Sequence, residues 1–299
     1  MAPQRVIGVD LGGTKIATGS IDLEGGVHER HEVPTPTDSQ EALLDGIAAA
    51  VEELAHGSIG AVGIGIPSVI DPATGKALGS VNIPLRDVAL ADLLQERLGI
   101  PVVIGNDGNM AALAEWKLGA AREVEGMVML TLGTGVGGGV VTGGSLYRGI
   151  AELGHVVVVA DGPPCQGNCT GRGHLEAVAS GNAADREAEK LWGEGADAER
   201  LVGGAQEGDA GALEALAGIG HLLGAAIGSF VNIFGPELVV VGGGFGIAAF
   251  EFLIDSANEI ARRETVVPEL VVKIVRAELG SEAGLVGAGL LALEALEGG

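Results

Sequence analysis

The sequence is poor in cysteine and in basic residues, and it has no long apolar run. Its 299 residues include two cysteines, and 40 Asp and Glu outnumber 17 Lys and Arg, which gives a net charge of −23. A surface this acidic repels nucleic acid and anionic membranes, so we expect neither as a partner. No uninterrupted apolar stretch approaches the ~18 residues of a membrane-spanning helix, and the opening MAPQRVIGVDLGG lacks the apolar run of a signal peptide. We therefore expect a cytoplasmic protein.

The rest of the composition is typical of a packed globular protein, with 47% apolar and 19% charged residues. The length favours two domains with a cleft between them. Two segments have the pattern of a β-hairpin: residues 6–21, with Gly12 and Gly13 at the turn, and a segment that begins at Gly126. Because helices and strands alternate after each hairpin, the pattern predicts two related α/β halves.

The domain boundary is expected near residue 115. Residues 1–115 and a closing helix at about 282–299 would form a small α/β domain, and residues 116–281 a large one that contains the cysteine loop. The periodicity of apolar residues predicts the following elements outside the hairpins: helices at 41–56, 89–98, 109–118 and 281–296, a long helix from about Leu213, and strands at 59–66, 102–104, 238–241 and 270–275.

The first hairpin turn carries polar residues that a turn does not need. In DLGGTK, residues 10–15, glycine lets backbone N–H groups approach phosphate oxygens, and the side chains of Thr14 and Lys15 would add donors. Asp10 could hold a hydrated Mg²⁺ ion. An ordinary tight turn would explain the two glycines but neither Asp10 nor Lys15. Both interpretations stay open on this loop alone.

The second hairpin turn, LGTGVGGG at residues 132–139, has more glycine than a turn requires. It does not match the Walker A pattern, and no helix follows it as in a Rossmann loop. Two such loops, each opening one half of the chain, could hold a phosphate chain between them. Gly133, Thr134 and Gly135 are the residues that we expect to contact it.

A third glycine cluster follows the apolar segment VVV. Gly242, Gly243 and Gly244 could let a flat nucleotide base lie against the backbone. An ordinary turn from a strand into a helix is the alternative.

A carboxylate, Asp107, lies where a strand passes into a helix, in NDGN at residues 106–109. Asp107 could be the N-cap of that helix, which is a common use of aspartate. It could also accept a proton from a hydroxyl nucleophile, since phosphoryl transfer needs one group that orients the attacking oxygen.

The two cysteines share one loop, with a histidine on each side. His155, Cys165, Cys169 and His174 supply two imidazoles and two thiols, a complete tetrahedral ligand set for structural Zn²⁺. Thiols stay reduced in the cytoplasm, which favours metal ligands over a disulfide. Inert thiols, a disulfide and a transient metal site remain alternatives on the spacing alone.

Taken together, these motifs resemble the ROK family of sugar kinases and regulators over nearly the whole chain. DLGGTK resembles the first phosphate loop of the sugar kinase/Hsp70/actin fold, LGTGVGGG its second, and VVVGGG its adenosine segment. The resemblance implies this α/β, ribonuclease H-like fold of two domains with a cleft between them. It is greatest to the ATP-dependent glucokinases of the family.

The resemblance also assigns the base. NDGNMAALAE, residues 106–115, is similar to the family segment whose aspartate is the catalytic base, which gives that role to Asp107. Gly108 and Met110 stand where alanines are usual, and this difference does not touch the chemistry.

Further polar residues match the sugar pocket of the family. Glu152 and His155 lie in AELGH and Glu176 lies in HLE, where the resemblance implies sugar contacts. Carboxylates and imidazoles suit a polyol because each can fix adjacent hydroxyls. Asn82, in VNIP, and Asn106, beside the base, are further candidates for sugar contacts.

The metal loop of the family has a histidine, nine residues, and three cysteines that end two residues before the sugar-binding glutamate. His155 and Cys165 keep the nine-residue gap, and Glu176 stands two residues beyond His174. This chain departs in two ways, since three residues separate its cysteines instead of one and His174 takes the place of the third cysteine. Because histidine is a competent ligand, we expect zinc to be retained with altered loop geometry.

The function expected from the motifs and the resemblance is ATP-dependent phosphorylation of glucose at its 6-hydroxyl, with Mg²⁺ and a structural Zn²⁺. A kinase for mannose, fructose or N-acetylmannosamine, and polyphosphate as the donor, are the alternatives among enzymes. A sugar-sensing ROK regulator is the alternative outside them. It needs an N-terminal DNA-binding domain, for which the position of Asp10 leaves no room. The resemblance implies a homodimer or homotetramer.

Overall fold

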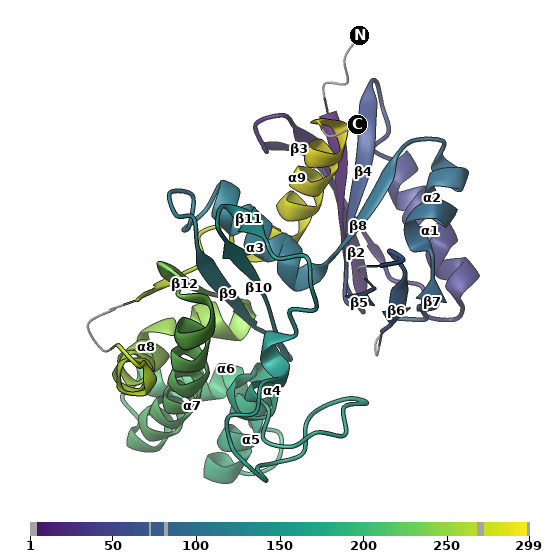
Figure 1. The fold of residues 1–299 in the computed structure, drawn as a ribbon. Helices are drawn as coiled ribbons and strands as arrows, with labels where there is room; N and C mark the ends of the chain where they lie inside the picture. Colours follow the sequence, from purple (N-terminus) through teal and green to yellow (C-terminus); the bar gives the residue numbers. More distant parts are fainter. Residues whose placement is uncertain (1–4, 72, 81–82, 268–271, 298–299) are drawn as a thin grey trace. The chain divides into compact units, whose positions relative to one another are not determined.

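The chain folds into two compact units, each with its own sheet and apolar core (Figure 1). The computed structural model describes residues 5–71, 73–80, 83–267 and 272–297. The first unit comprises Met1–Leu118, Arg148–Ala151 and Glu282–Gly299, and the second comprises Gly119–Tyr147 and Glu152–Ser281.

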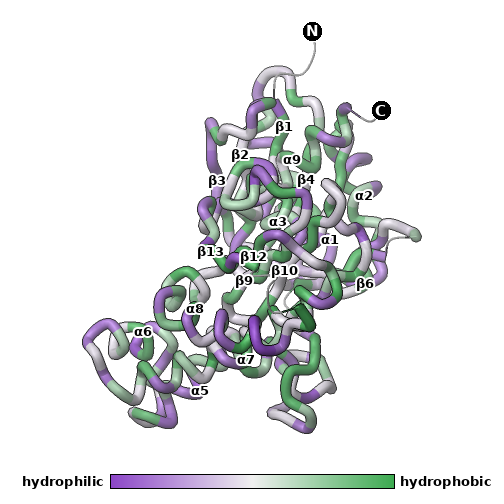
Figure 2. The backbone as a smooth tube through the Cα atoms, turned by 60° about the vertical axis from the view of Figure 1, so that its left-hand side comes forward, coloured by the Kyte–Doolittle hydropathy of each residue, from purple (hydrophilic) through white to green (hydrophobic). Residues whose placement is uncertain are grey.

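The sheet of the first unit has the order β3-β2-β1-β4-β8. β1 (Arg5–Leu11) and β2 (Lys15–Asp22) form the predicted hairpin, and β3 (Val27–Pro34) extends it antiparallel. β4 (Ile59–Ile66) and β8 (Val102–Asn106) continue the sheet parallel to β1. β3 is an edge strand with mostly exposed, hydrophilic residues, drawn largely purple in Figure 2.

In the described part of this unit, four α-helices flank the sheet: α1 (Gln40–Glu52), α2 (Leu90–Leu98), α3 (Asp107–Lys117) and α9 (Ala283–Glu297). α9 packs directly on β4, and a Cβ atom at Gly63 would lie 1.8 Å from the Ala288 carbonyl oxygen. Only glycine permits this approach. A small sheet of β5 (Val69–Ile70), β6 (Ala77–Gly79) and β7 (Arg86–Val88) completes the unit.

The second sheet repeats the order of the first, as β11-β10-β9-β12-β13. β9 (Met127–Leu132), β10 (Val136–Thr142) and β11 (Ser145–Leu146) are antiparallel. β12 (Leu238–Gly242) and β13 (Lys273–Arg276) run parallel to β9. Both units thus begin with a hairpin and add two parallel strands, which confirms the prediction of two related α/β halves.

The described residues of the second unit form five α-helices: α4 (Leu175–Ala179), α5 (Gly181–Trp192), α6 (Ala198–Gln206), α7 (Ala210–Phe234) and α8 (Gly244–Glu264). α7 and α8 pack along each other, and a Cβ atom at Gly224 of α7 would lie 2.5 Å from the Ala257 carbonyl oxygen. Among the described helices, α7 alone has the length and composition to span a membrane. Its contacts with α8 and with the core mark it as a core helix.

Candidate active site and metal centre

The four predicted metal ligands come together in the second unit. His155 ends a 3₁₀ turn, Leu153–His155, and the other three ligands lie in the loop that leads into α4. One ligand atom from each of the four lies within 4.8 Å of all the others. His155 Nδ1 is 3.2 Å from His174 Nδ1 and 3.7 Å from Cys165 Sγ, and Cys169 Sγ is 3.6 Å from His174 Nδ1.

These separations match the edges of a tetrahedral zinc site. Zn–S bonds of ~2.3 Å and Zn–N bonds of ~2.05 Å, at tetrahedral angles, place two nitrogens ~3.3 Å apart and a nitrogen and a sulfur ~3.6 Å apart. Cys165 and Cys169 are free thiols, not a disulfide, and both are half-buried. The four residues can therefore hold a structural metal ion, and the wider spacing of the cysteines does not keep their sulfur atoms apart.

A short backbone hairpin shapes the loop around these ligands. The Cys165 N–H donates to the Gly171 carbonyl at 3.0 Å, and the Gly173 N–H donates to the Pro163 carbonyl at 2.8 Å. Gly173 has a φ of +64°, and a Cβ atom there would lie 1.7 Å from the Val159 carbonyl oxygen. Burial raises the pKa of the Cys165 thiol to about 11, so a metal cation is what would turn it into a thiolate ligand.

The predicted sugar-binding residues of the second unit adjoin this cluster. His155 directs Nδ1 into the cluster, while its Nε2 lies 4.0 Å from Glu152 Oε2. Glu176 Oε1 lies 3.8 Å from Cys165 Sγ, and Glu176 Oε2 accepts a hydrogen bond from the Val136 N–H at 3.0 Å. Glu152, His155 and Glu176 therefore form one continuous set of polar groups with the metal ligands.

The glycines of the second loop and of the β12–α8 turn divide into two kinds. At Gly135 a Cβ atom would lie 2.2 Å from Glu176 Oε2, and at Gly243, where φ is +81°, it would lie 2.4 Å from the Leu132 carbonyl oxygen. Gly243 is therefore required by the fold, because it meets backbone at a positive φ, whereas at Gly135 only the end of the Glu176 side chain would have to move. At Gly133 and Gly244 a Cβ atom would meet no described atom within 4 Å. Gly133 and Gly244 therefore leave backbone open to a ligand.

The first loop is a tight turn in the first unit. The Gly12 N–H donates to the Lys15 carbonyl at 2.9 Å, and the Thr14 carbonyl accepts from the Thr35 N–H at 3.0 Å. Lys15 Nζ forms an exposed ion pair with Glu32 Oε1 at 3.0 Å. The turn found here is compatible with both interpretations of DLGGTK.

Asp10 lies at the end of β1 against the first turn of α9. A Cβ atom at Gly284 would lie 3.0 Å from the Asp10 carboxylate. Burial raises the pKa of Asp10 above its ordinary value, although the positive charges of Lys15 and Arg30 act in the opposite direction. Burial thus makes the ionised form of Asp10 less favourable than it is in water, and a bound cation would offset this cost.

Asp107 is the first residue of α3, but it is not the N-cap. Asn106 takes that position, since its Oδ1 accepts from the Asn109 N–H at 3.2 Å while its Nδ2 donates to the Ser68 carbonyl at 3.3 Å. Asp107 is half-buried, and its Oδ1 accepts from the Gly108 N–H at 2.8 Å. The capping role considered for Asp107 therefore belongs to Asn106.

The candidate residues belong to both units. The metal ligands, Glu152, Glu176 and the second glycine loop lie in the second unit, whereas Asp10, the first loop, Asn106 and Asp107 lie in the first. Asn82, a predicted sugar contact, lies outside the described residues. The sequence did not point to Gln166, whose amide contacts the second loop and which no motif marks.

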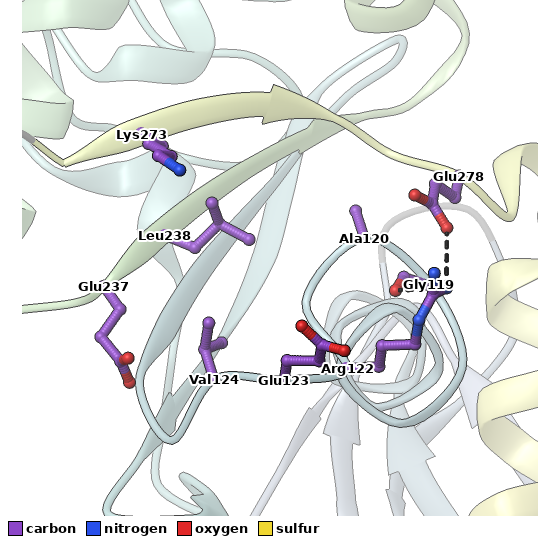
Figure 3. Close-up of a pocket in the computed structure, with 9 residues that line it drawn as sticks. All are labelled: Gly119, Ala120, Arg122, Glu123, Val124, Glu237, Leu238, Lys273 and Glu278. Carbon is purple, nitrogen blue, oxygen red and sulfur yellow. Dashed lines mark hydrogen bonds and ion pairs between the residues drawn. The ribbon is translucent and has the colours of Figure 1, made fainter.

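A cavity of about 410 Å³ lies at the opposite end of the second sheet, at the first residues of β12 and β13 (Figure 3). Leu238 and Lys273 line it from the strands. Arg122 lines it from the loop that precedes β9 and points toward Glu278, with which its Nη1 pairs at 3.2 Å. None of the predicted site residues lines this cavity, so it is not part of the candidate active site.

The chain is similar to sugar kinases over its full length. It is 37% identical over 321 residues to glucokinase from Thermotoga maritima, with 100% of both chains covered. It is 33% identical to N-acetylmannosamine kinase from Shigella boydii, with 96% of this chain and 97% of that protein covered. The sequence similarity thus extends to kinases with different sugar substrates.

The fold of the chain is also similar to the folds of solved structures. A ROK family glucokinase from Streptomyces griseus, in complex with glucose and AMPPNP, has a TM-score of 0.84 at 34% identity, over 97% of this chain and 99% of that one. A ROK hexokinase from Thermus thermophilus has a TM-score of 0.85 at 36% identity, over 99% and 100%. A ROK family transcriptional regulator has a TM-score of 0.88 at 26% identity, over 98% of this chain and 78% of the regulator. These matches confirm the predicted two-domain α/β fold of the sugar kinase/Hsp70/actin type.

The family assignment follows from the extent of these matches. The model of the ROK family matches residues 6–295, which is nearly the whole chain. The cluster of His155, Cys165, Cys169 and His174 is consistent with the metal-binding motif expected for that family. The chain belongs to the ROK family.

Proposed function

We propose that this protein catalyses ATP-dependent phosphorylation of glucose at its 6-hydroxyl. The observation that carries the proposal is the full-length similarity to glucokinases, including one solved with glucose and AMPPNP. The polar set of Glu152, His155 and Glu176 supports it, because adjacent carboxylates and imidazoles can pair with the neighbouring hydroxyls of a hexose.

In this proposal Asp107 accepts the proton of the 6-hydroxyl while the hydroxyl oxygen attacks the γ-phosphorus of ATP. The bond between that phosphorus and the bridging oxygen breaks, and ADP leaves. Asp10 would hold Mg²⁺ through water, which would offset the charge of the phosphates. The remaining candidates for contacts with the nucleotide lie in three segments. They are Gly12, Gly13, Thr14 and Lys15 in the first loop, Gly133, Thr134 and Gly135 in the second loop, and Gly242, Gly243 and Gly244, which would lie beside the nucleotide base.

We propose that the metal is a structural Zn²⁺ that fixes the sugar-binding residues. His155 would bind it through Nδ1, which leaves Nε2 on the side of Glu152 for a sugar hydroxyl. Glu176 lies two residues beyond His174 and against Cys165, so the same ion would hold its carboxylate in place. The metal would thus organise sugar recognition without contacting the phosphates.

The proposal extends to sugar choice and to the state of the protein in the cell. Mannose, fructose and N-acetylmannosamine stay alternative substrates, and the similarity to an N-acetylmannosamine kinase supports the last of them. The similarity to a regulator keeps a sugar-sensing role. Asn82 and Asn106 stay candidates for the contacts that distinguish these sugars. We propose a cytoplasmic enzyme that assembles as a homodimer or homotetramer and needs neither nucleic acid nor membrane.

A substrate panel tests the proposed function. Glucose, mannose, fructose and N-acetylmannosamine would each be assayed with ATP and with polyphosphate, and kcat/KM compared. We expect glucose with ATP to exceed every other pair by at least about tenfold, since a site built to pair hydroxyls discriminates strongly against a misplaced one. A higher kcat/KM for another sugar or for polyphosphate would reassign the substrate. Absence of turnover with every pair would contradict a kinase.

A further inference from the structure

Gln166, in the metal-binding loop, connects that loop to other segments of the second unit through its side-chain amide. Its Nε2 lies 2.9 Å from Ser180 Oγ, 3.2 Å from the Glu176 carbonyl oxygen and 3.5 Å from the Thr134 carbonyl oxygen. Its Oε1 accepts a hydrogen bond from Asn182 Nδ2. Both ends of the amide are therefore engaged, and the side chain is held in one orientation.

The partners of Gln166 are themselves fixed. Ser180 is fully buried and is the N-cap of α5, where its Oγ accepts from the Ala183 N–H at 3.2 Å. Gln166 directly follows Cys165, one of the four metal ligands. A single side chain thus spans from the metal cluster to the start of α5 and to the second glycine loop.

Two successive carbonyl groups of the second glycine loop point toward the start of α5 and toward Gln166. The Gly181 N–H donates to the Gly133 carbonyl at 2.7 Å, and Gln166 Nε2 approaches the Thr134 carbonyl. A trans peptide directs its N–H opposite to its C=O. Because these two carbonyls point toward α5 and Gln166, the N–H groups of Thr134 and Gly135 point away from α5 and Gln166.

Both of those N–H groups lack a hydrogen-bond partner among the residues that the structure describes, as expected of donors kept for a ligand. The loop backbone at Gly133 is open, since a Cβ atom there would meet no described atom within 4 Å. Successive free N–H groups on an open backbone are typical of an anion-binding loop.

We propose that Gln166 is a positioning residue that orients the second glycine loop for the nucleotide phosphates and couples this loop to the metal-binding loop. The inference rests on the proposed function, because it takes the phosphates of ATP as the anion. It adds a second task for the metal ion: by fixing Cys165, the ion fixes Gln166 and, through it, the peptide that carries the Gly135 N–H.

The test compares Gln166→Met with the wild type. Methionine keeps the length of the side chain but has neither the amide donor nor its acceptor. We expect KM for ATP, and the Kd for AMPPNP measured by calorimetry without sugar, to rise about tenfold, the equivalent of one hydrogen bond. KM for glucose should change less than about twofold, and zinc per chain should stay at the wild-type value. A purely structural role would instead move both KM values or lower kcat alone.

The matched control is Asn168→Ala, in the same loop. Asn168 is exposed and has no hydrogen bond among the described contacts, so its removal should leave all four quantities unchanged. Chelation of the metal from the wild type should weaken AMPPNP binding. Chelation of the metal from Gln166→Met should weaken AMPPNP binding no further, since both changes act through the contact of Gln166 with the second glycine loop.

A Gln166→Met protein that is folded and metal-loaded, with wild-type KM for ATP and Kd for AMPPNP, would overturn the inference. If Gln166→Met does not fold, Asn182→Ala removes the group that orients the amide, and unchanged AMPPNP binding there would overturn it equally. Failure of the proposed function is a separate result: the wild type would then phosphorylate no hexose, while the comparison of AMPPNP binding would still decide the role of Gln166.

Discussion

At the scale of single residues, Asp10 is the clearest conflict between stability and function, because its buried carboxylate lowers stability and is needed for Mg²⁺ in our proposal. Burial raises the pKa of Asp10, so the folded protein holds its proton more tightly than the unfolded chain does. The free energy of unfolding therefore falls as the pH rises from the ordinary pKa of 3.8 through the raised pKa of the folded protein. Above that pKa, the full cost of burying the ionised carboxylate is present. Such a cost is typical of a residue kept for a ligand.

Asp10→Asn tests this conflict. We expect the variant to have a higher thermal midpoint than the wild type at pH 7, because it removes a buried negative charge, and the difference to vanish below the ordinary Asp pKa of 3.8, where both forms are neutral. Turnover should fall at least about 100-fold if Asp10 holds Mg²⁺. The exposed Asp38→Asn is the matched control and should change neither quantity. A lower midpoint for Asp10→Asn at pH 7 would refute the assigned cost.

Single residues also show which features of the site could and could not be predicted from the sequence. The ligand set of His155, Cys165, Cys169 and His174 was predictable because the residue types and their order suffice to suggest a tetrahedral site. Contacts between residues that lie far apart in the sequence were not predictable. Glu176 occupies the space beside Gly135, 41 positions earlier in the chain, and Gln166 belongs to no motif. Only the folded chain reveals that such residues share one network.

At the scale of elements, the turn from β12 into α8 separates two uses of glycine. Gly243 has a positive φ and lies against the Leu132 backbone, so its role is structural. Gly244 begins α8 without a positive φ, and its missing side chain leaves open space. Adjacent glycines thus serve the fold and, in our proposal, the nucleotide.

The pair of substitutions Gly243→Ala and Gly244→Ala tests this division. Gly243→Ala should lower the free energy of unfolding by about 1–3 kcal/mol or more, because alanine is strained at positive φ and would contact Leu132. Gly244→Ala should leave that energy unchanged or raise it by up to about 1 kcal/mol, since alanine favours helix. It should nevertheless raise KM for ATP several-fold. A wild-type KM for ATP in Gly244→Ala would remove this surface from the nucleotide site.

The elements that the sequence predicted are those with a strong local signal. The two hairpins follow from apolar runs broken by glycine, and the strand at 59–66 is found as β4 with those bounds. The edge strand β3, VHERHEVP, was missed because its mostly charged and polar side chains hide the alternation of a strand. The small sheet of β5, β6 and β7 was missed because its strands have two or three residues and owe their pairing to tertiary structure.

One helix start differs from the prediction for a physical reason. The helix predicted at 109–118 begins at Asp107 as α3, because the Asn106 side chain caps the Asn109 N–H. Asparagine and aspartate are both favoured at the N-cap, so the sequence did not decide between Asn106 and Asp107. The structure thereby separates the residue that caps the helix from the candidate base.

At the scale of the whole molecule, the two units share one strand order, in which a hairpin is followed by two parallel strands. Each unit places a glycine turn at the end of its hairpin, so the candidate phosphate loops are equivalent parts of two similar folds. The full-length family match, over residues 6–295, covers both units. In our proposal, the function therefore needs both: the base and the first loop from one unit, and the sugar-binding residues, the metal and the second loop from the other.

The most direct test of this account is the steady-state turnover of Asp107→Asn with glucose and ATP, measured beside the Kd of the same protein for glucose. We predict that turnover is lost by at least a factor of about 100, because asparagine cannot accept the proton of the 6-hydroxyl, while glucose still binds with an affinity close to that of the wild type. Wild-type turnover in a correctly folded Asp107→Asn protein would contradict the account.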